Sequence, residues 1–227
     1  MKSHFNFKNP KTPSLILSAF ILFTLFITAC NKSNYNESGG TAYVMAVNSA
    51  QASAPQDFYV DNNKINATAL AYTQSTAYVG VNAGLRNAQF RTSGTTTVNA
   101  SGGISFVPGS YSSVFFTDDN SAVVTQDDRT SPPANKARVR FINLSSSINT
   151  SVDFGLSTGN KIINGLSYKT ASVYNEVDAN TSFSLYASGS TTAMLSIPTT
   201  IQAGKIYTVV VSGATAATLT YTVVLQN

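Results

Sequence analysis

The residue types that usually perform catalysis or bind metals are scarce in this chain of 227 residues, which contains one His, one Cys and no Trp. A metal cluster, a disulfide framework or a Cys–His couple needs more than one such residue, so the sequence predicts none of them. General bases or nucleophiles would have to be Asp, Glu, Lys, Ser, Thr or Tyr. Ten Asp and Glu residues are present, so pairs of carboxylates are the first arrangement to consider.

Two pairs of carboxylates could resemble the acid and base of a glycosidase, whose carboxyl groups flank one bond about 5–10 Å apart. Asp57 and Asp153 are each followed by Phe, and they occupy the same position in two copies of a repeat described below. We interpret them as structural residues that accept hydrogen bonds from backbone N–H groups of a turn. Glu176 and Asp178 share one face of a predicted strand, where solvated surface is the favoured interpretation.

The acidic clusters Asp118-Asp119-Asn120 and Asp127-Asp128 could in principle bind Ca²⁺, which prefers oxygen ligands. Neither cluster has the spaced ligands and the glycine of an EF-hand loop, so surface turns are the default interpretation. The sequence predicts no metal site and no cofactor, and whether an acidic loop binds Ca²⁺ stays open. Gly39-Gly40 and Gly102-Gly103 lack the strand-to-helix context of a phosphate-binding loop.

Arg138 and Arg140 alternate with apolar residues, which places both guanidinium groups on one face of a strand. The nearest acidic residues in the sequence are Asp127 and Asp128, so an inter-domain contact is one interpretation. A ligand site for a phosphate or an acidic glycan is the other. Two arginines are too few for a nucleic-acid interface, and no nucleic acid is predicted as a partner.

The N-terminus has the pattern of an export signal. Three lysines precede an apolar run from Leu15 to Ile27, which is shorter than the roughly 20 residues of a membrane-spanning helix. The run ends in Ile27-Thr28-Ala29-Cys30, which resembles the lipobox of bacterial lipoproteins. That resemblance implies a signal peptide over 1–29, cleavage before Cys30, and attachment of a diacylglycerol to its thiol; acyl chains of this kind anchor a protein stably in a membrane.

Residues 30–40 are polar and end in two glycines, which is typical of a flexible tether. Cleavage before Cys30 would remove the only His and three of the fourteen basic residues, so that eleven basic residues face ten acidic ones. The mature chain would then be nearly neutral.

Beyond the tether the chain repeats itself at an offset of 95 or 96 residues. The matching positions are Ala42–Asn48 with Ala137–Asn143, Asp57-Phe58 with Asp153-Phe154, Leu70 and Tyr72 with Leu166 and Tyr168, Tyr78 with Tyr174, Ser93-Gly94 with Ser188-Gly189, and Gly109 with Gly204. We therefore predict two domains, 41–130 and 131–227, joined by a short connector that is stiffened by Pro132-Pro133.

Each copy is predicted to consist of β-strands. Val44 and Ala46 alternate with their neighbours, and the stretches 207–212 and 218–225 are β-branched. Short runs of this kind recur every eight to fifteen residues between Gly, Asn, Ser and Pro. The expected fold is all-β: two tandem immunoglobulin-like antiparallel β-sandwiches after a lipoprotein signal peptide.

The stretch Lys136–Ser145, followed by Val152-Asp153, resembles the opening of the bacterial family called domain of unknown function 4397. The resemblance implies a secreted or lipid-anchored protein, often with tandem copies, and supplies no reaction. The sequence departs from the family at its Ser-Pro-Asp-Ala-Pro turn, which is Ser145–Asn149 here.

These observations predict a lipid-anchored, non-enzymatic binding or structural module of the cell envelope, at the outer membrane. Charged residues make up 11% of the chain, against about 25% in an average protein, so adhesion or glycan contact through neutral hydrogen bonds is the favoured role. The partners would be the membrane, through Cys30, and a glycan or an envelope protein. The alternative is an accessory subunit of an outer-membrane assembly, bound through its strand edges. Whether the domains face the periplasm or the outside stays open.

Overall fold

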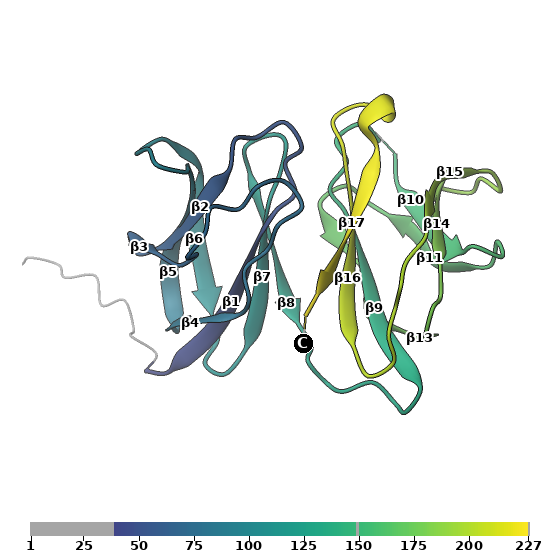
Figure 1. The fold of residues 1–227 in the computed structure, drawn as a ribbon, viewed down its shortest axis with the longest axis horizontal. Helices are drawn as coiled ribbons and strands as arrows, with labels where there is room; N and C mark the ends of the chain where they lie inside the picture. Colours follow the sequence, from purple (N-terminus) through teal and green to yellow (C-terminus); the bar gives the residue numbers. More distant parts are fainter. Residues whose placement is uncertain (1–38, 149, 227) are drawn as a thin grey trace, which may run out of the picture. The chain divides into compact units, whose positions relative to one another are not determined.

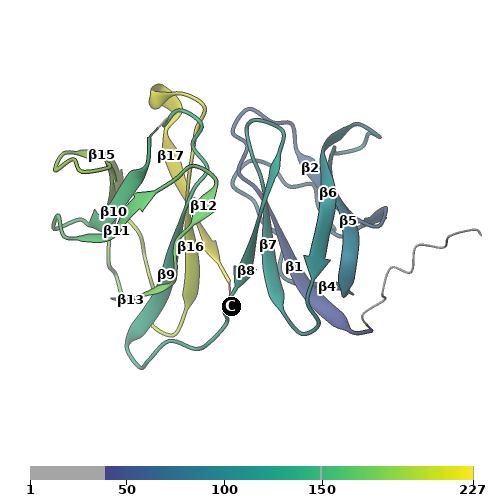
Figure 2. The same cartoon turned by 180° about the vertical axis from the view of Figure 1, so that it is seen from behind.

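The computed structural model describes residues 39–148 and 150–226, and Figures 1 and 2 show them from opposite sides. The predicted signal peptide, Cys30 and most of the tether lie outside the described residues. The described chain is almost entirely β-structure, with a single turn of 3₁₀ helix, η1 (Ala216–Thr218). The all-β fold class predicted from the sequence is therefore confirmed.

The first sandwich is formed by β1 (Thr41–Asn48), β2 (Gln56–Val60), β3 (Asn63–Lys64), β4 (Val79–Asn82), β5 (Gly84–Thr92), β6 (Val98–Phe106), β7 (Tyr111–Phe116) and β8 (Ala122–Asp127). One of its sheets has the strand order β4-β1-β7-β8, and the other has the order β3-β2-β5-β6. Strands β6 and β8 therefore lie at the edges of their sheets.

The second sandwich is formed by β9 (Lys136–Asn143), β10 (Val152–Leu156), β11 (Lys161–Leu166), β12 (Thr170–Ala171), β13 (Asn175–Asp178), β14 (Phe183–Ala187), β15 (Ala193–Ile197), β16 (Ile206–Ser212) and β17 (Thr220–Leu225). Its sheets have the orders β12-β9-β16-β17, with β13 also paired to β9, and β11-β10-β14-β15. The connector between the sandwiches runs from 128 to 135.

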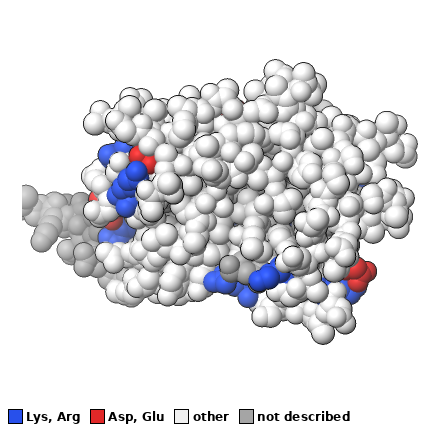
Figure 3. Space-filling model, viewed as in Figure 1, with Lys and Arg blue, Asp and Glu red and all other residues white. Residues whose placement is uncertain are grey.

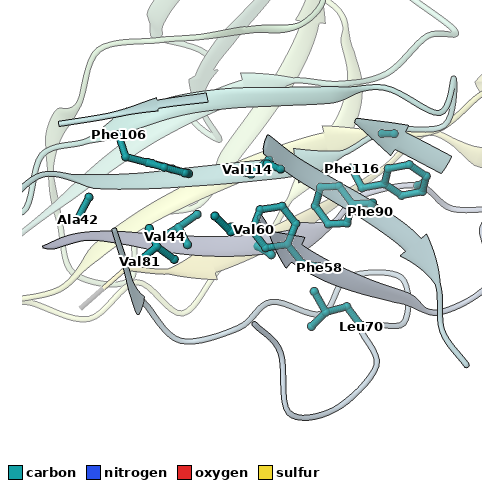
Figure 4. Close-up of a cluster of buried hydrophobic side chains, with 14 of the residues drawn as sticks. Ala42, Val44, Phe58, Val60, Leu70, Val81, Phe90, Phe106, Val114 and Phe116 are labelled. Atoms are coloured by element: carbon teal, nitrogen blue, oxygen red, sulfur yellow. The ribbon is translucent and has the colours of Figure 1, made fainter. Parts of the chain in front are cut away.

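Each sandwich has its own apolar core, because alternate residues of both sheets point inward. The first core includes Phe58, Phe90 and Phe116, whose rings lie in a row with centroids 4.8 and 5.2 Å apart (Figure 4). In the second core Phe141 stacks on Phe154 at 4.4 Å. Aromatic packing of this kind replaces the Cys pair and the Trp of antibody domains.

Two details differ from the arrangement predicted from the sequence. The pairs β1–β7 and β9–β16 are parallel, one in each sandwich. The last strand begins at Thr220 instead of 218, because Thr215 and Thr218 cap each other and close the 3₁₀ turn before it.

No helix of the described residues is long and apolar enough to cross a membrane.

Candidate functional site: the interface between the two sandwiches

The two sandwiches belong to one compact unit and share a third apolar cluster. Its buried members are Met45, Val47 and Phe115 from the first sandwich and Ile142, Leu144, Val210 and Val224 from the second. The 95-residue offset makes Val47 equivalent to Ile142, and Phe115 equivalent to Val210. Both copies thus use the same face, as the partners of a two-fold symmetric dimer do.

Arg140 lies at the centre of this interface with 2% of its surface exposed. Its Nε donates to Thr208 Oγ1 at 2.9 Å within the second sandwich. Its other two nitrogens reach the first sandwich, where Nη1 donates to the Gln126 carbonyl at 2.9 Å and Nη2 donates to Thr125 Oγ1 at 2.8 Å. Nη2 also forms a buried ion pair with Asp127. All three nitrogens of the guanidinium are therefore engaged with protein oxygens.

Asp127 accepts hydrogen bonds on both carboxylate oxygens. Its Oδ2 accepts from the hydroxyls of Tyr78 and Ser113, each at 2.6 Å, and Oδ1 accepts from Thr125 at 3.2 Å in addition to Arg140. Burial, together with the negative charge of Asp127, raises the pKa of Tyr78 far above its usual range, so its hydroxyl stays protonated and remains a donor.

Gln226 completes the network from the second sandwich and is fully buried. Its Oε1 accepts from Tyr174 Oη and from Thr208 Oγ1, each at 2.8 Å. Its Nε2 donates to Tyr78 Oη and Ser113 Oγ across the interface, each at 3.3 Å. Burial raises the pKa of Tyr174 to about 12, so this hydroxyl is also a donor at neutral pH.

The repeat explains how the network is built. Ser113 is equivalent to Thr208, and the strand registers then make Asp127 equivalent to Gln226. Tyr78 and Tyr174 are also equivalent. The copies differ where the charges lie, because the first has Met45 and Asp127 where the second has Arg140 and Gln226. Each copy therefore has one charged residue where the other copy has a neutral one. These two charged residues, Arg140 and Asp127, form a single ion pair across the interface.

Arg138 lies at the rim of the same interface. Its Nη2 donates to Asp128 Oδ2 at 2.6 Å and its Nη1 to the Thr130 carbonyl at 2.8 Å, while its guanidinium carbon lies 5.0 Å from the centre of the Tyr174 ring. The hydrogen bond from Arg138 lowers the pKa of Asp128 well below its usual range. The structure thus places Arg140 in contact with the end of the first sandwich and Arg138 in contact with the connector.

A second set of polar contacts crosses the interface elsewhere. Lys169 Nζ lies 2.6 Å from Asp119 Oδ2, and Tyr72 Oη lies 2.9 Å from Ser212 Oγ. Burial opposes ionisation of Asp119, but hydrogen bonds, led by the one from Lys169, outweigh it and lower the pKa to about 2. The hydroxyl of Tyr168, the equivalent of Tyr72, is buried and has no hydrogen-bond partner among the described residues.

The remaining carboxylates have structural contacts. Asp153 accepts from the backbone N–H groups of Gly165 and Gly189 at 2.8 and 2.9 Å, as its place in the repeat predicted. Its counterpart Asp57 differs from this prediction, because it accepts from the side chains of Asn66 and Ser93 and forms an ion pair with Lys64 at 2.8 Å instead of contacting backbone N–H groups.

The acidic residues on β13 lie at the edge of the second sandwich. Glu176 is exposed opposite Arg138, and Asp178 pairs with Lys136 at 2.6 Å. Within residues 39–148 and 150–226, no three His, Cys, Asp or Glu side chains are arranged to hold a metal ion.

Several members of the network have no sequence pattern that marks them as functional, namely Thr125, Ser113, Thr208 and Gln226. The repeat singled out Tyr78 and Tyr174 but not their role. The arrangement consists of donors and acceptors that pair with one another. It is a largely buried network of hydrogen bonds and one ion pair that connects the two sandwiches.

Comparison with known proteins gives a family for part of the chain. No curated protein matches the chain. Among solved structures, the carbohydrate-binding module CBMbc (family CBM26) of Eubacterium rectale Amy13K, in complex with maltoheptaose, is 11% identical, with a TM-score of 0.28 over 82% of this chain and 97% of that chain. A putative cell adhesion protein from Bacteroides eggerthii is 11% identical, with a TM-score of 0.21 over 83% and 96% of the two chains. Such scores carry no inference about function. Residues 42–154, from β1 into β10, match the family described as "Domain of unknown function (DUF4397)", so the chain contains a domain of that family.

Proposed function

We propose that this protein is a lipid-anchored, non-enzymatic binding module of the cell envelope, held at the outer membrane by an acylated Cys30. The support for the anchor is the sequence Ile27-Thr28-Ala29-Cys30, which lies outside the described residues. The polar stretch 31–40 separates that cysteine from Thr41, where the first strand begins. A tether of this composition would hold the two sandwiches off the membrane.

The observation that carries the binding role is the low charge of one face of the sandwiches. Figure 3 shows one face of the molecule, where Lys, Arg, Asp and Glu lie toward the edges and the broad middle is uncharged. The arginines that could have recognised an acidic ligand are already bonded to the protein. A surface of neutral hydroxyl and amide groups suits a neutral polymer such as a glycan, which is bound through many uncharged hydrogen bonds.

We expect the soluble chain that begins at Asn31 to be retained on neutral polysaccharides in a glycan array. Retention should change little between low and high salt, because the contacts involve no ion pairs that salt would screen. Loss of retention at high salt would contradict the neutral-surface proposal. Binding to no polymer, together with cross-linking to one fixed envelope protein in intact cells, would favour the accessory-subunit role instead.

The anchor is tested by Cys30→Ser in the full chain. We expect an unprocessed precursor that incorporates no labelled fatty acid, since the hydroxyl of serine does not replace the thiol that carries the diacylglycerol. Ser33→Ala, three residues further along the tether, is the control and should be processed and labelled normally. Normal labelling of the Cys30→Ser variant would remove the lipoprotein proposal without affecting the binding proposal.

A further inference from the structure

An apolar groove with a volume of about 320 Å³ opens between the edge strands β6 and β8 of the first sandwich. Beneath it lie Phe58 and Phe90, buried core residues that are 0% and 1% exposed and are shown with Val114 in Figure 4, while Val124 and Ile104 line its more exposed part. Its rim carries the uncharged polar residues Ser101, Asn120 and Ser121. No charged residue lines the groove, and its volume lies at the small end of ligand pockets, which measure about 300–1,000 Å³.

The groove exists because four positions around it have small side chains. The 95-residue offset and the strand registers pair each of them with a larger residue of the second sandwich. The pairs are Ala88 with Phe183, Ala100 with Leu195, Gly102 with Ile197, and Ala122 with Tyr221.

In the second sandwich these larger side chains fill the space between the two sheets. Phe183 and Ile197 are fully buried in the core, and Leu195 and Tyr221 pack against it. Tyr221 also spans the gap between the edges, because its hydroxyl donates to the Pro198 carbonyl at 2.8 Å. The second sandwich therefore fills these four positions with its own side chains, which the first copy does not, and the hollow that remains at its edge lies beside Tyr221 and Val223.

The opening leaves an apolar side chain exposed to solvent above a buried core. Val124 on β8 is 44% exposed at the mouth of the groove, and Phe90 and Ala88 lie beneath it. An added Cβ at Gly102 would meet no atom within 4 Å, so the glycine is not required by close packing. Filling the site with the residues of the second copy would bury more apolar surface and stabilise the domain.

We propose that the first sandwich binds a small, neutral, mainly apolar molecule in this groove, with an alkyl or aryl group against Val124, Ile104 and the space left by Gly102 and Ala122. The hydroxyl and amide groups of the rim would hydrogen-bond a polar end. The uncharged lining excludes anionic and cationic ligands, because a charge moved from water into such a site finds no partner. This proposal does not depend on the lipid anchor or on glycan binding.

The test uses N-phenyl-1-naphthylamine, a neutral aromatic dye whose fluorescence rises in apolar surroundings, with the soluble chain that begins at Asn31. We expect saturable binding of one dye per chain, and displacement by 1-decanol at concentrations about tenfold or more below those needed for decanoate. Equal displacement by both would overturn the requirement for a neutral ligand.

The double variant Gly102→Ile/Ala122→Tyr puts the side chains of the second sandwich into the groove. It should weaken dye binding about tenfold or more while thermal stability is kept or increased. Ser105→Ile adds the same side chain on the opposite face of β6 and should leave binding within about twofold of the original. If the double variant does not fold, Gly102→Ile alone serves the same purpose. Unsaturable fluorescence, or equal binding by the filled and the original chains, would overturn the proposal.

Discussion

Replacing Arg140 by Met, the residue at the equivalent position of the first copy, is expected to lower the free energy of unfolding by about 3–5 kcal/mol. The substitution nearly conserves the length of the side chain but leaves the carboxylate of Asp127 buried without its counter-ion. It also removes hydrogen bonds to Thr125, Thr208 and the Gln126 carbonyl. Urea denaturation of the soluble chain that begins at Asn31 measures the change.

Most of that loss should return when the buried charge is removed as well. In Arg140→Met/Asp127→Asn the amide oxygen can still accept from the hydroxyls of Tyr78 and Ser113, and no net charge remains in the interface. Buried ion pairs can often be replaced by neutral groups with little net change in stability, whereas removal of one partner is strongly destabilising. The double variant should therefore be clearly more stable than Arg140→Met alone.

Arg138→Met is the matched control, because it removes the neighbouring arginine on the same strand face. Its partner Asp128 is 51% exposed, and exposed pairs of this kind contribute about 0–1 kcal/mol. Equal losses for Arg138→Met and Arg140→Met would contradict the central role of the Arg140–Asp127 pair.

Much of the fold could be predicted from the sequence because the chain contains two copies of one module, and each copy can be compared with the other. The match between Ala42–Asn48 and Ala137–Asn143 correctly located the strands β1 and β9. The alternation of apolar residues predicted strands throughout. It could not predict the parallel pairs β1–β7 and β9–β16, because periodicity indicates which face a residue occupies and contains no information on the direction of the neighbouring strand.

The site was only partly predictable. Alternation placed Arg138 and Arg140 on one strand face, and proximity in the sequence made Asp127 and Asp128 candidate partners. Nothing indicated that Arg140 is buried and Arg138 lies at the rim, since that depends on how the two sheets pack. Gln226 directly follows the last strand, and its neighbours in the sequence do not distinguish it from a solvated polar residue. Its burial follows from the pairing of β17 with β16, which the hydrogen bond from Gln226 N to the Ile206 carbonyl continues.

The groove in the first sandwich illustrates a different limit. Ala88, Ala100, Gly102 and Ala122 are weak strand formers, and as isolated residues they indicate only a poorly packed strand. The strand registers align them with Phe183, Leu195, Ile197 and Tyr221, and this alignment shows that the first copy has small residues where the second has large ones. The repeat was visible in the sequence, but its gaps lie in loops. The offset rises from 95 to 99 before the last strand, so only the registers assign each position.

Replacing Gln226 by Leu is expected to lower the free energy of unfolding by about 2–4 kcal/mol. Leucine fills a similar volume, but it leaves the buried hydroxyls of Tyr174 and Thr208 without an acceptor, and each unsatisfied group costs about 1–3 kcal/mol. The gain in apolar surface offsets part of this. Gln126→Leu is the control, because Gln126 is exposed and its equivalent in the second copy is Leu225; it should change stability by no more than about 0.5 kcal/mol.

The double variant Arg140→Met/Gln226→Leu distinguishes a connected network from two separate contacts. Thr208 Oγ1 accepts from Arg140 and donates to Gln226, so the two substitutions act on one hydroxyl that lies between them. Residues that share a partner in this way show coupling energies of about 0.5–3 kcal/mol. Additive losses would mean that the two sides act independently. Non-additive losses would show that the ion pair and the glutamine act together, so that the joint between the sandwiches forms or breaks as one unit.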